Sequence, residues 1–179
     1  MRPTQWPHPL LQAYWESGTH AAEGATQPAI QNLLMHLLRL VDAPHAVELG
    51  VWKGATSRWL ACGLPPGGRL ELVDPDPGCL HVAADRVGAL ALPITVTTHQ
   101  QHTMDYLPTI PDTVRFVFLD DDKAQIPEKL GLLTARLPHC VVAIHDLETI
   151  GAQIWKDWNL IPLRVASDPS GGDLGLTSW

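Results

Sequence analysis

The chain has 179 residues, 45% of them hydrophobic, which is enough to bury the core of one domain, and its composition indicates no second domain. The formal net charge is -7, with 19 acidic residues against 12 scattered Lys and Arg, so nucleic acid is not an expected partner. The chain lacks both a secretory signal and an apolar run near the roughly 20 residues that cross a bilayer, so we expect a cytoplasmic protein without a membrane partner.

Residues 1–25 mix Pro, Gly, Thr and Trp without a sustained period, and we expect an arm or short lid there, with a short helix around 10–17. From Thr26 to Val41 apolar residues recur at helical spacing. Thr26 is the expected cap, and Pro28 is tolerated in the first turn. This segment predicts an amphipathic helix that packs on a sheet and opens the main domain, residues 26–179.

Strand and helix patterns then alternate along the chain. The predicted strands are 46–50, 69–74, 94–98, 114–120 and 140–146, and the predicted helices are 56–63, 79–90 and 126–137. Strands that are apolar on both faces and alternate with helices indicate a parallel sheet covered on both sides. Residues 161–167 and 174–179, joined by the turn DPSGGD, predict a terminal hairpin. The expected fold class is α/β: a single doubly wound Rossmann-like domain with a mostly parallel seven-stranded sheet and an antiparallel C-terminal hairpin.

Three widely spaced cysteines lie inside apolar segments, which is typical of reduced core thiols rather than of disulfides or a zinc site. They are Cys62, Cys79 and Cys140. We assign no chemistry to them.

Polar residues gather at the predicted carboxyl ends of the strands. They are Glu48 to Gly54, Asp74, His99 to Thr103, Asp120 to Lys123, and His145 with Asp146. In an open doubly wound sheet ligands bind beyond the carboxyl ends of the strands, so these side chains form one polar rim on an apolar body. The sequence therefore predicts the functional site along this border.

The turn after the first strand carries Gly50 and Gly54, which let the backbone turn sharply and approach a ligand. The next helix directs its amide N-terminus, with Thr56 in the first turn, at an anionic group, yet the turn matches neither a P-loop nor a dinucleotide fingerprint. Glu48 suits a cationic amino group, and Asp74 is placed to accept both hydroxyls of a ribose. S-adenosylmethionine, with an amino acid at one end and a nucleoside at the other, satisfies these features.

From about residue 26 to its end the chain resembles the class I methyltransferases, specifically the catechol and caffeoyl-CoA type of O-methyltransferase. The segments that carry the resemblance are VELGVWKGATSRWLA, LELVDPDP, FVFLDDDK, VVAIHDLE and GGDLGLTSW. The signature FVFLDDDK is the specific part, because the glycine turn occurs across many methyltransferases. The resemblance implies that the methionine end of the cofactor is held by Glu48 and Thr56, with Trp52 packed near it. It also implies that Asp74 binds the ribose and that the residues near the adenine are His102 and Thr103.

Members of that family hold a divalent cation with the signature Asp and a later Asp-Asn pair, and they use the signature Lys as the base. The resemblance therefore implies that Asp120 is a metal ligand, that Lys123 deprotonates the acceptor, and that His145 and Asp146 replace the Asp-Asn pair. An imidazole in the set favours Mn, Fe, Co or Zn over Mg. In the mechanism that this implies, a bound cation would make the acceptor hydroxyl more acidic, Lys123 would take its proton if burial keeps the lysine neutral, and the oxygen would attack the sulfonium methyl in line.

These assignments have structural alternatives. Packing or helix capping is the alternative for Trp52, Thr56 and Asp74. A solvated or self-paired charge is the alternative for Asp120, Lys123, His145 and Asp146.

We expect an enzyme that transfers methyl from S-adenosylmethionine to a hydroxyl of a small aromatic acceptor, assisted by a divalent metal. The alternatives are a methyltransferase acting on a sugar hydroxyl or a nitrogen in secondary metabolism, and a non-catalytic homologue that keeps the nucleoside pocket. The expected partner is a small-molecule acceptor. The short arm is compatible with an open pocket and with one completed by a second subunit in a homodimer.

Overall fold

The computed structural model describes residues 6–23, 26–146, 157, 161–163 and 174–178. Five strands form a parallel layer: β1 (His45–Leu49), β2 (Arg69–Asp74), β3 (Thr95–Gln100), β4 (Phe116–Leu119) and β5 (Val141–Ile144). The sheet order is β3-β2-β1-β4-β5-β7-β6, in which β7 (Leu174–Ser178) runs antiparallel to β5 and to β6 (Ile161–Leu163). The predicted α/β Rossmann-like fold is confirmed, whereas the turn predicted between β6 and β7 lies outside the described residues.

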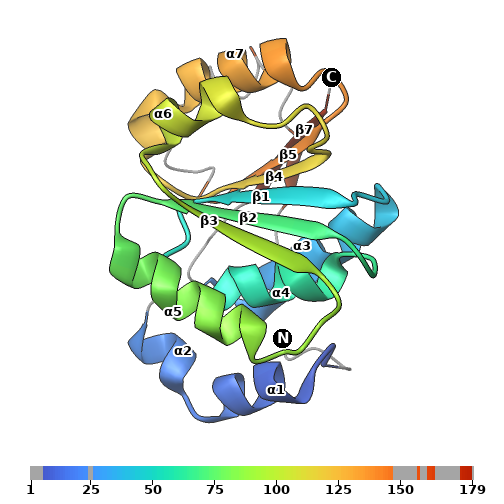
Figure 1. The fold of residues 1–179 in the computed structure, drawn as a ribbon, viewed down its shortest axis with the longest axis vertical. Coiled ribbons are helices and arrows are strands. Elements are labelled where there is room, and N and C mark those ends of the chain that lie inside the picture. Colours follow the sequence, from blue (N-terminus) through green and yellow to red (C-terminus); the bar gives the residue numbers. More distant parts are fainter. Residues whose placement is uncertain (1–5, 24–25, 147–156, 158–160, 164–173, 179) are drawn as a thin grey trace.

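Helices cover both faces of this sheet (Figure 1). One face carries α3 (Pro28–Leu40), α4 (Ala55–Gly63) and α5 (Pro77–Gly88), and the other carries α6 (Thr103–Tyr106) and α7 (Ile126–Arg136). Beyond α4 and α5 lie α1 (Pro9–Glu16) and α2 (Thr19–Ala22). Two 3-10 turns, η1 (Leu107–Thr109) and η2 (Lys123–Gln125), precede β4 and α7. Within the described part of the chain, no helix has the length and apolar character needed to span a membrane.

The predicted elements are present with shifted ends. The N-cap of α3 is Gln27, which makes no side-chain capping bond, so the prediction that Thr26 caps this helix is wrong. The helix predicted from residue 79 begins at Pro77, because the side chain of Asp76 accepts the Gly78 amide at 2.7 Å and so caps α5. Asp76 therefore does the capping that was the structural alternative for Asp74.

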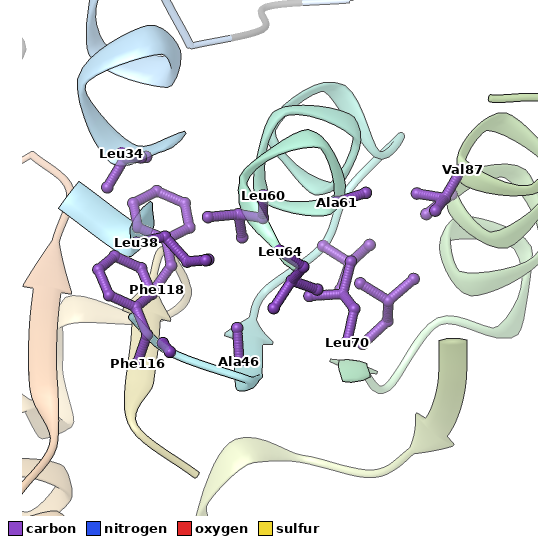
Figure 2. Packing of buried hydrophobic residues seen from close by; sticks show 14 of the residues in the cluster. Leu34, Leu38, Ala46, Leu60, Ala61, Leu64, Leu70, Val87, Phe116 and Phe118 are labelled. Atoms are coloured by element: carbon purple, nitrogen blue, oxygen red, sulfur yellow. The ribbon is translucent and has the colours of Figure 1, made fainter. Parts of the chain in front are cut away.

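Apolar side chains from α3, α4 and the sheet form the larger core (Figure 2). Leu34 and Leu38 of α3, Leu60 of α4, and Phe116 and Phe118 of β4 are all 0% exposed. Burying each such side chain contributes about 1.5–3 kcal/mol to folding. A second core lies between the opposite sheet face and α6 and α7, so the sheet is covered on both sides. This packing fixes the strand ends against the N-terminus of α4.

A polar network is buried on the α6 side of β2. The carboxylate of Glu71 accepts hydrogen bonds from Tyr106 Oη at 2.6 Å and from His45 Nε2 at 2.8 Å. His99 Nε2 lies 2.7 Å from the same carboxylate but outside hydrogen-bond geometry, and His45 Nδ1 lies 2.8 Å from Thr113 Oγ1. Burial alone would raise the pKa of Glu71, but the hydrogen bonds from His45 and Tyr106 outweigh it and lower this pKa to about 2.

This network is expected to stabilise the fold at neutral pH and to lose that contribution in acid. With a folded pKa of about 2 against an ordinary value of 4.5, Glu71 stabilises the folded state above pH 4.5, and the contribution disappears as the pH falls through about 2. A shift of this size corresponds to about 3 kcal/mol. Glu71→Gln should therefore lower the free energy of unfolding at neutral pH and flatten its fall in acid. Urea unfolding between about pH 7 and pH 3 measures both changes. If the free energy of unfolding fell in parallel with pH in Glu71→Gln and in the unaltered protein, the expectation would be contradicted.

Candidate functional site

A cavity of about 680 Å³ opens at the carboxyl ends of the strands, beside the first turns of α4 and α6. Its lining includes every predicted site residue except Gly54 and Lys123. These lining residues are Glu48, Gly50, Trp52, Thr56, Asp74, His102, Thr103, Asp120, His145 and Asp146. Most of the polar rim inferred from the strand ends therefore lines one shared hollow, although His99 and Lys123 do not.

Two glycines shape the turn between β1 and α4, each for a different contact. Gly50 has φ +85°, and a Cβ there would lie 2.7 Å from the backbone oxygen of Asp120, so glycine lets the ends of β1 and β4 meet closely. Gly54 has φ +71°, and a Cβ there would lie 2.6 Å from Ala83 Cα in α5. Gly50 thus serves the cavity, and Gly54 serves the packing of α5 behind it.

Glu48 is the buried carboxyl group at the floor of the cavity, with 1% of its surface exposed. Its Oε2 accepts a hydrogen bond from Oγ of Ser57, a residue that the sequence did not single out. Burial raises the pKa of Glu48 well above its ordinary value, as do the charges of Asp120 and Asp74. An ammonium group beside Glu48 would favour its ionised form, so this position fits the amino end of an amino acid.

Asp74 holds the glycine turn through backbone amides. Its Oδ2 accepts from Val51 N at 2.9 Å and from Trp52 N at 3.3 Å, while its Oδ1 accepts from Asp76 N at 2.9 Å. These three amides use both lone pairs of Oδ2 and one of Oδ1, so Oδ1 can still accept one ribose hydroxyl. Trp52 itself is 56% exposed and has φ +48°, an uncommon conformation for a bulky residue.

The start of α6 lines the part of the cavity where the adenine was predicted to lie. Thr103 is 7% exposed there, His102 is the exposed N-cap, and Met104, which was not predicted, also lines the hollow. His99, from the same polar stretch of sequence, instead faces Glu71 on β2. The strand-end pattern therefore located this region but did not resolve which histidine faces the cavity.

The acidic end of the cavity joins three potential metal ligands. Asp120 Oδ1 lies 3.1 Å from His145 Nδ1, which lies 3.2 Å from Asp146 Oδ1. One ligand atom of each of the three lies within 4.8 Å of the others. Burial would lower the pKa of His145, but hydrogen bonds to the two carboxylates outweigh it and raise this pKa to about 9. A divalent cation in this set of two oxygens and one nitrogen would replace the positive charge of the imidazolium, and the mixed set suits Mn, Fe, Co or Zn.

Two lysines hold the loop that follows β4. Lys123 Nζ donates to Asp120 Oδ1 at 3.0 Å and is not among the residues that line the cavity. Lys129 of α7 does line it, is 1% exposed, and donates to Asp121 Oδ1 at 2.7 Å and to Asp122 O at 2.6 Å. Lys129 was missed, although a charged residue on the apolar stripe of a helix is a signal that the sequence does carry.

Residues 47–147 match the model of a family described as "Methyltransferase domain". The chain is 28% identical over 121 residues to a protein of Mycobacterium sp. (strain JLS) provisionally assigned as an O-methyltransferase. It is also 28% identical over 122 residues to the catechol O-methyltransferase of Niastella koreensis. These alignments cover 66% and 63% of this chain and 55% of each relative, so the chain spans about half the length of the curated relatives that it matches.

Solved structures share the fold over nearly the whole chain. The O-methyltransferase TomG of Streptomyces achromogenes, involved in tomaymycin synthesis and solved in complex with S-adenosylmethionine, has a TM-score of 0.73 and 22% identity. That match covers 96% of this chain and 90% of TomG. An O-methyltransferase of Bacillus cereus in complex with S-adenosylhomocysteine has a TM-score of 0.75 and 17% identity, covering 94% and 90% of the two chains. At these identities the likeness establishes the fold alone.

Proposed function

Because this chain belongs to the methyltransferase domain family, we propose that its cavity binds S-adenosylmethionine and that the protein methylates a hydroxyl of a small aromatic acceptor. The observation that carries the proposal is the meeting of Glu48, Asp74 and Asp120 around one cavity of about 680 Å³.

The cofactor would lie along the β1 and β2 side of the cavity. Glu48 would face its amino group, the amides and hydroxyl at Thr56 its carboxylate, and Asp74 its ribose. His102, with Thr103, would border the adenine. When bound, S-adenosylmethionine supplies a methyl group that its sulfonium already activates. The task left to the chain is to hold the acceptor oxygen in line with that methyl.

The acceptor would lie at the acidic end, against Asp120, His145 and Asp146. A divalent cation held there would make the acceptor hydroxyl more acidic. Lys123, whose Nζ lies 3.0 Å from Asp120 Oδ1, is the proposed base; it does not line the cavity, so its side chain would have to turn from that carboxylate toward the acceptor. In this proposal residues 26–179 are the methyltransferase domain, and a homodimer is the proposed assembly.

Calorimetry with S-adenosylhomocysteine tests the cofactor part of the proposal. We expect binding at one site per chain, and methyl transfer to catechol-type hydroxyls that rises when Mn²⁺ or Mg²⁺ is added to chelator-treated protein. Absence of binding would overturn the proposed function. Binding with transfer that is indifferent to every divalent metal would overturn only the metal assistance, and binding without transfer to aromatic or sugar acceptors would favour a non-catalytic homologue.

A further inference from the structure

We propose that Glu23 is a positioning residue that latches the arm, defined here as α1, α2 and Glu23, onto the glycine turn. Docking of the arm and binding of the cofactor would then reinforce one another. The inference rests on the proposed function, since S-adenosylhomocysteine is the ligand through which the coupling is measured.

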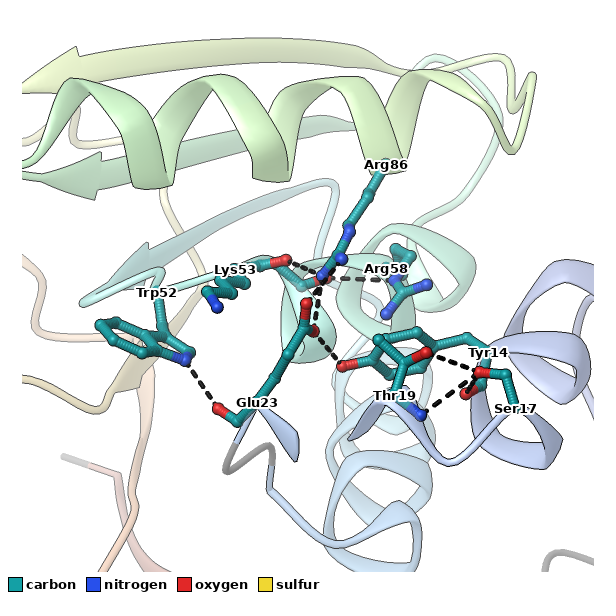
Figure 3. A network of polar contacts seen from close by, with 9 residues as sticks. Tyr14, Ser17, Thr19, Glu23, Trp52, Lys53, Arg58 and Arg86 are labelled. Carbon is teal, nitrogen blue, oxygen red and sulfur yellow. Dashed lines mark hydrogen bonds and ion pairs between the residues drawn. The ribbon is translucent and has the colours of Figure 1, made fainter. Parts of the chain in front are cut away.

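The side chain of Glu23 joins the arm to α5 (Figure 3). Arg86 Nη1 donates to Glu23 Oε2 at 2.9 Å, and Arg86 Nη2 donates to Glu23 Oε1 at 2.8 Å. Tyr14 Oη, from α1, donates to Glu23 Oε2 at 2.6 Å. A bidentate guanidinium pair of this kind is shorter and stronger than a neutral hydrogen bond. With the Glu23 side chain 12% exposed, the pair is also partly shielded from water.

The same residue also reaches the turn that shapes the cavity. Trp52 Nε1 donates to the backbone oxygen of Glu23 at 2.8 Å, and Arg86 Nη1 donates to the backbone oxygen of Lys53 at 2.7 Å. Glu23 lines the cavity beside Trp52. Two consecutive residues of the turn are therefore held by Glu23 or by the arginine that Glu23 holds.

The charges under the arm make Glu23 difficult to replace. Arg58 is 5% exposed, its guanidinium carbon lies 3.8 Å from the centroid of the Tyr14 ring, and its Nη2 has no hydrogen-bond partner among the described residues. The guanidinium of Arg86 lies 5.4 Å from the same centroid. The hydrogen bond from Arg86 lowers the pKa of Glu23 to about 2, so the carboxylate stays charged. Without it, two partly buried cations would face the arm with no counter-charge from Glu23, which opposes docking.

Coupling follows from this arrangement by linkage. A ligand that orders the turn around Trp52 also favours the conformation to which Glu23 binds, so the docked arm is stabilised. Loss of docking must then weaken ligand binding by the same factor. Such couplings typically amount to roughly 5- to 150-fold in affinity.

The test compares Glu23→Gln with Glu16→Gln. Glu16 is an exposed carboxylate on α1 that accepts a hydrogen bond from Gln12 of the same helix at 2.9 Å, so it is a matched control in the arm. We expect Glu23→Gln to raise the Kd for S-adenosylhomocysteine roughly tenfold and Glu16→Gln to leave it unchanged. In hydrogen exchange, the amides of residues 9–22 should exchange faster in Glu23→Gln, and the ligand should slow them in the unaltered protein.

Glu23→Asp keeps the charge but withdraws it by one methylene, and we expect an intermediate Kd. Arg86→Met should raise the Kd by a smaller factor in the Glu23→Gln variant than in the unaltered protein, because both substitutions break the same ion pair. An unchanged Kd in Glu23→Gln, or a raised Kd with unchanged arm exchange, would overturn the latch. If the unaltered protein does not bind the ligand, the proposed function fails instead, and exchange of the arm still reports whether Glu23 docks it.

Discussion

Gly50→Ala is expected to abolish binding of S-adenosylhomocysteine and to lower the free energy of unfolding by about 3–5 kcal/mol. The new Cβ would lie 2.7 Å from Asp120 O and 2.9 Å from Asp121 N, both backbone atoms at the end of β4. These atoms cannot rotate away as a flexible side chain would. The end of β4 must therefore separate from the turn, which disturbs the proposed cofactor side and the acidic side of the cavity together. Urea unfolding and calorimetry measure the two losses.

Gly67→Ala is the matched control. Gly67 also has a left-handed φ, +79°, but a Cβ there would meet nothing within 4 Å. Its substitution should show the conformational penalty alone, about 1–2 kcal/mol, with ligand binding preserved. The difference in unfolding free energy and in ligand binding between the two variants measures the contribution of the close contact between the ends of β1 and β4. Equal losses in both variants would contradict a role for that contact.

Asp120→Asn is expected to lower turnover about 1,000-fold while leaving binding of S-adenosylhomocysteine within about twofold. Asp120 Oδ1 is shared by Lys123 at 3.0 Å and His145 at 3.1 Å, so neutralising it removes the charge that positions both. It also removes one of the three proposed metal ligands. Steady-state kinetics with and without Mn²⁺ measure the loss and any change in metal affinity.

Asp105→Asn is the control for that prediction, since Asp105 is an exposed acid of α6 that does not line the cavity. Its turnover should be unchanged. Lys123→Ala tests the proposed base apart from the proposed metal ligand Asp120. Removal of a general base should lower turnover about 100-fold. Full activity in Lys123→Ala would exclude Lys123 as the base. Full activity in Asp120→Asn would exclude a catalytic role for the acidic end of the cavity.

The layers of this fold follow from its sequence pattern because β1, β2 and β4 are buried strands, and each is followed along the chain by a longer helix, α4, α5 or α7. Element ends are less predictable. Thr26 has the side chain of a good cap, but α3 begins at Pro28 and its N-cap is Gln27. The four residues of α6 are too few to show a period and were missed.

The position of the site followed from topology, since parallel strands bring their carboxyl ends to one border. What each side chain does there depends on contacts between distant segments. Lys129 is 1% exposed and tied to Asp121, and Glu23 reaches Arg86 across 63 positions of sequence. His99 is directed at Glu71 because β3 and β2 are neighbours in the sheet. No local pattern specifies these pairings.

The two oxygens of Asp74 have a consequence for how sugar recognition can be studied. They accept hydrogen bonds from the backbone amides of Val51, Trp52 and Asp76. The residue proposed to bind the ribose therefore also stabilises the loop beside it. Any replacement of Asp74 therefore changes the shape of the loop and its proposed contact with the sugar at the same time. Recognition of the ribose is better dissected by altering the ligand, with deoxynucleoside analogues offered to the intact protein.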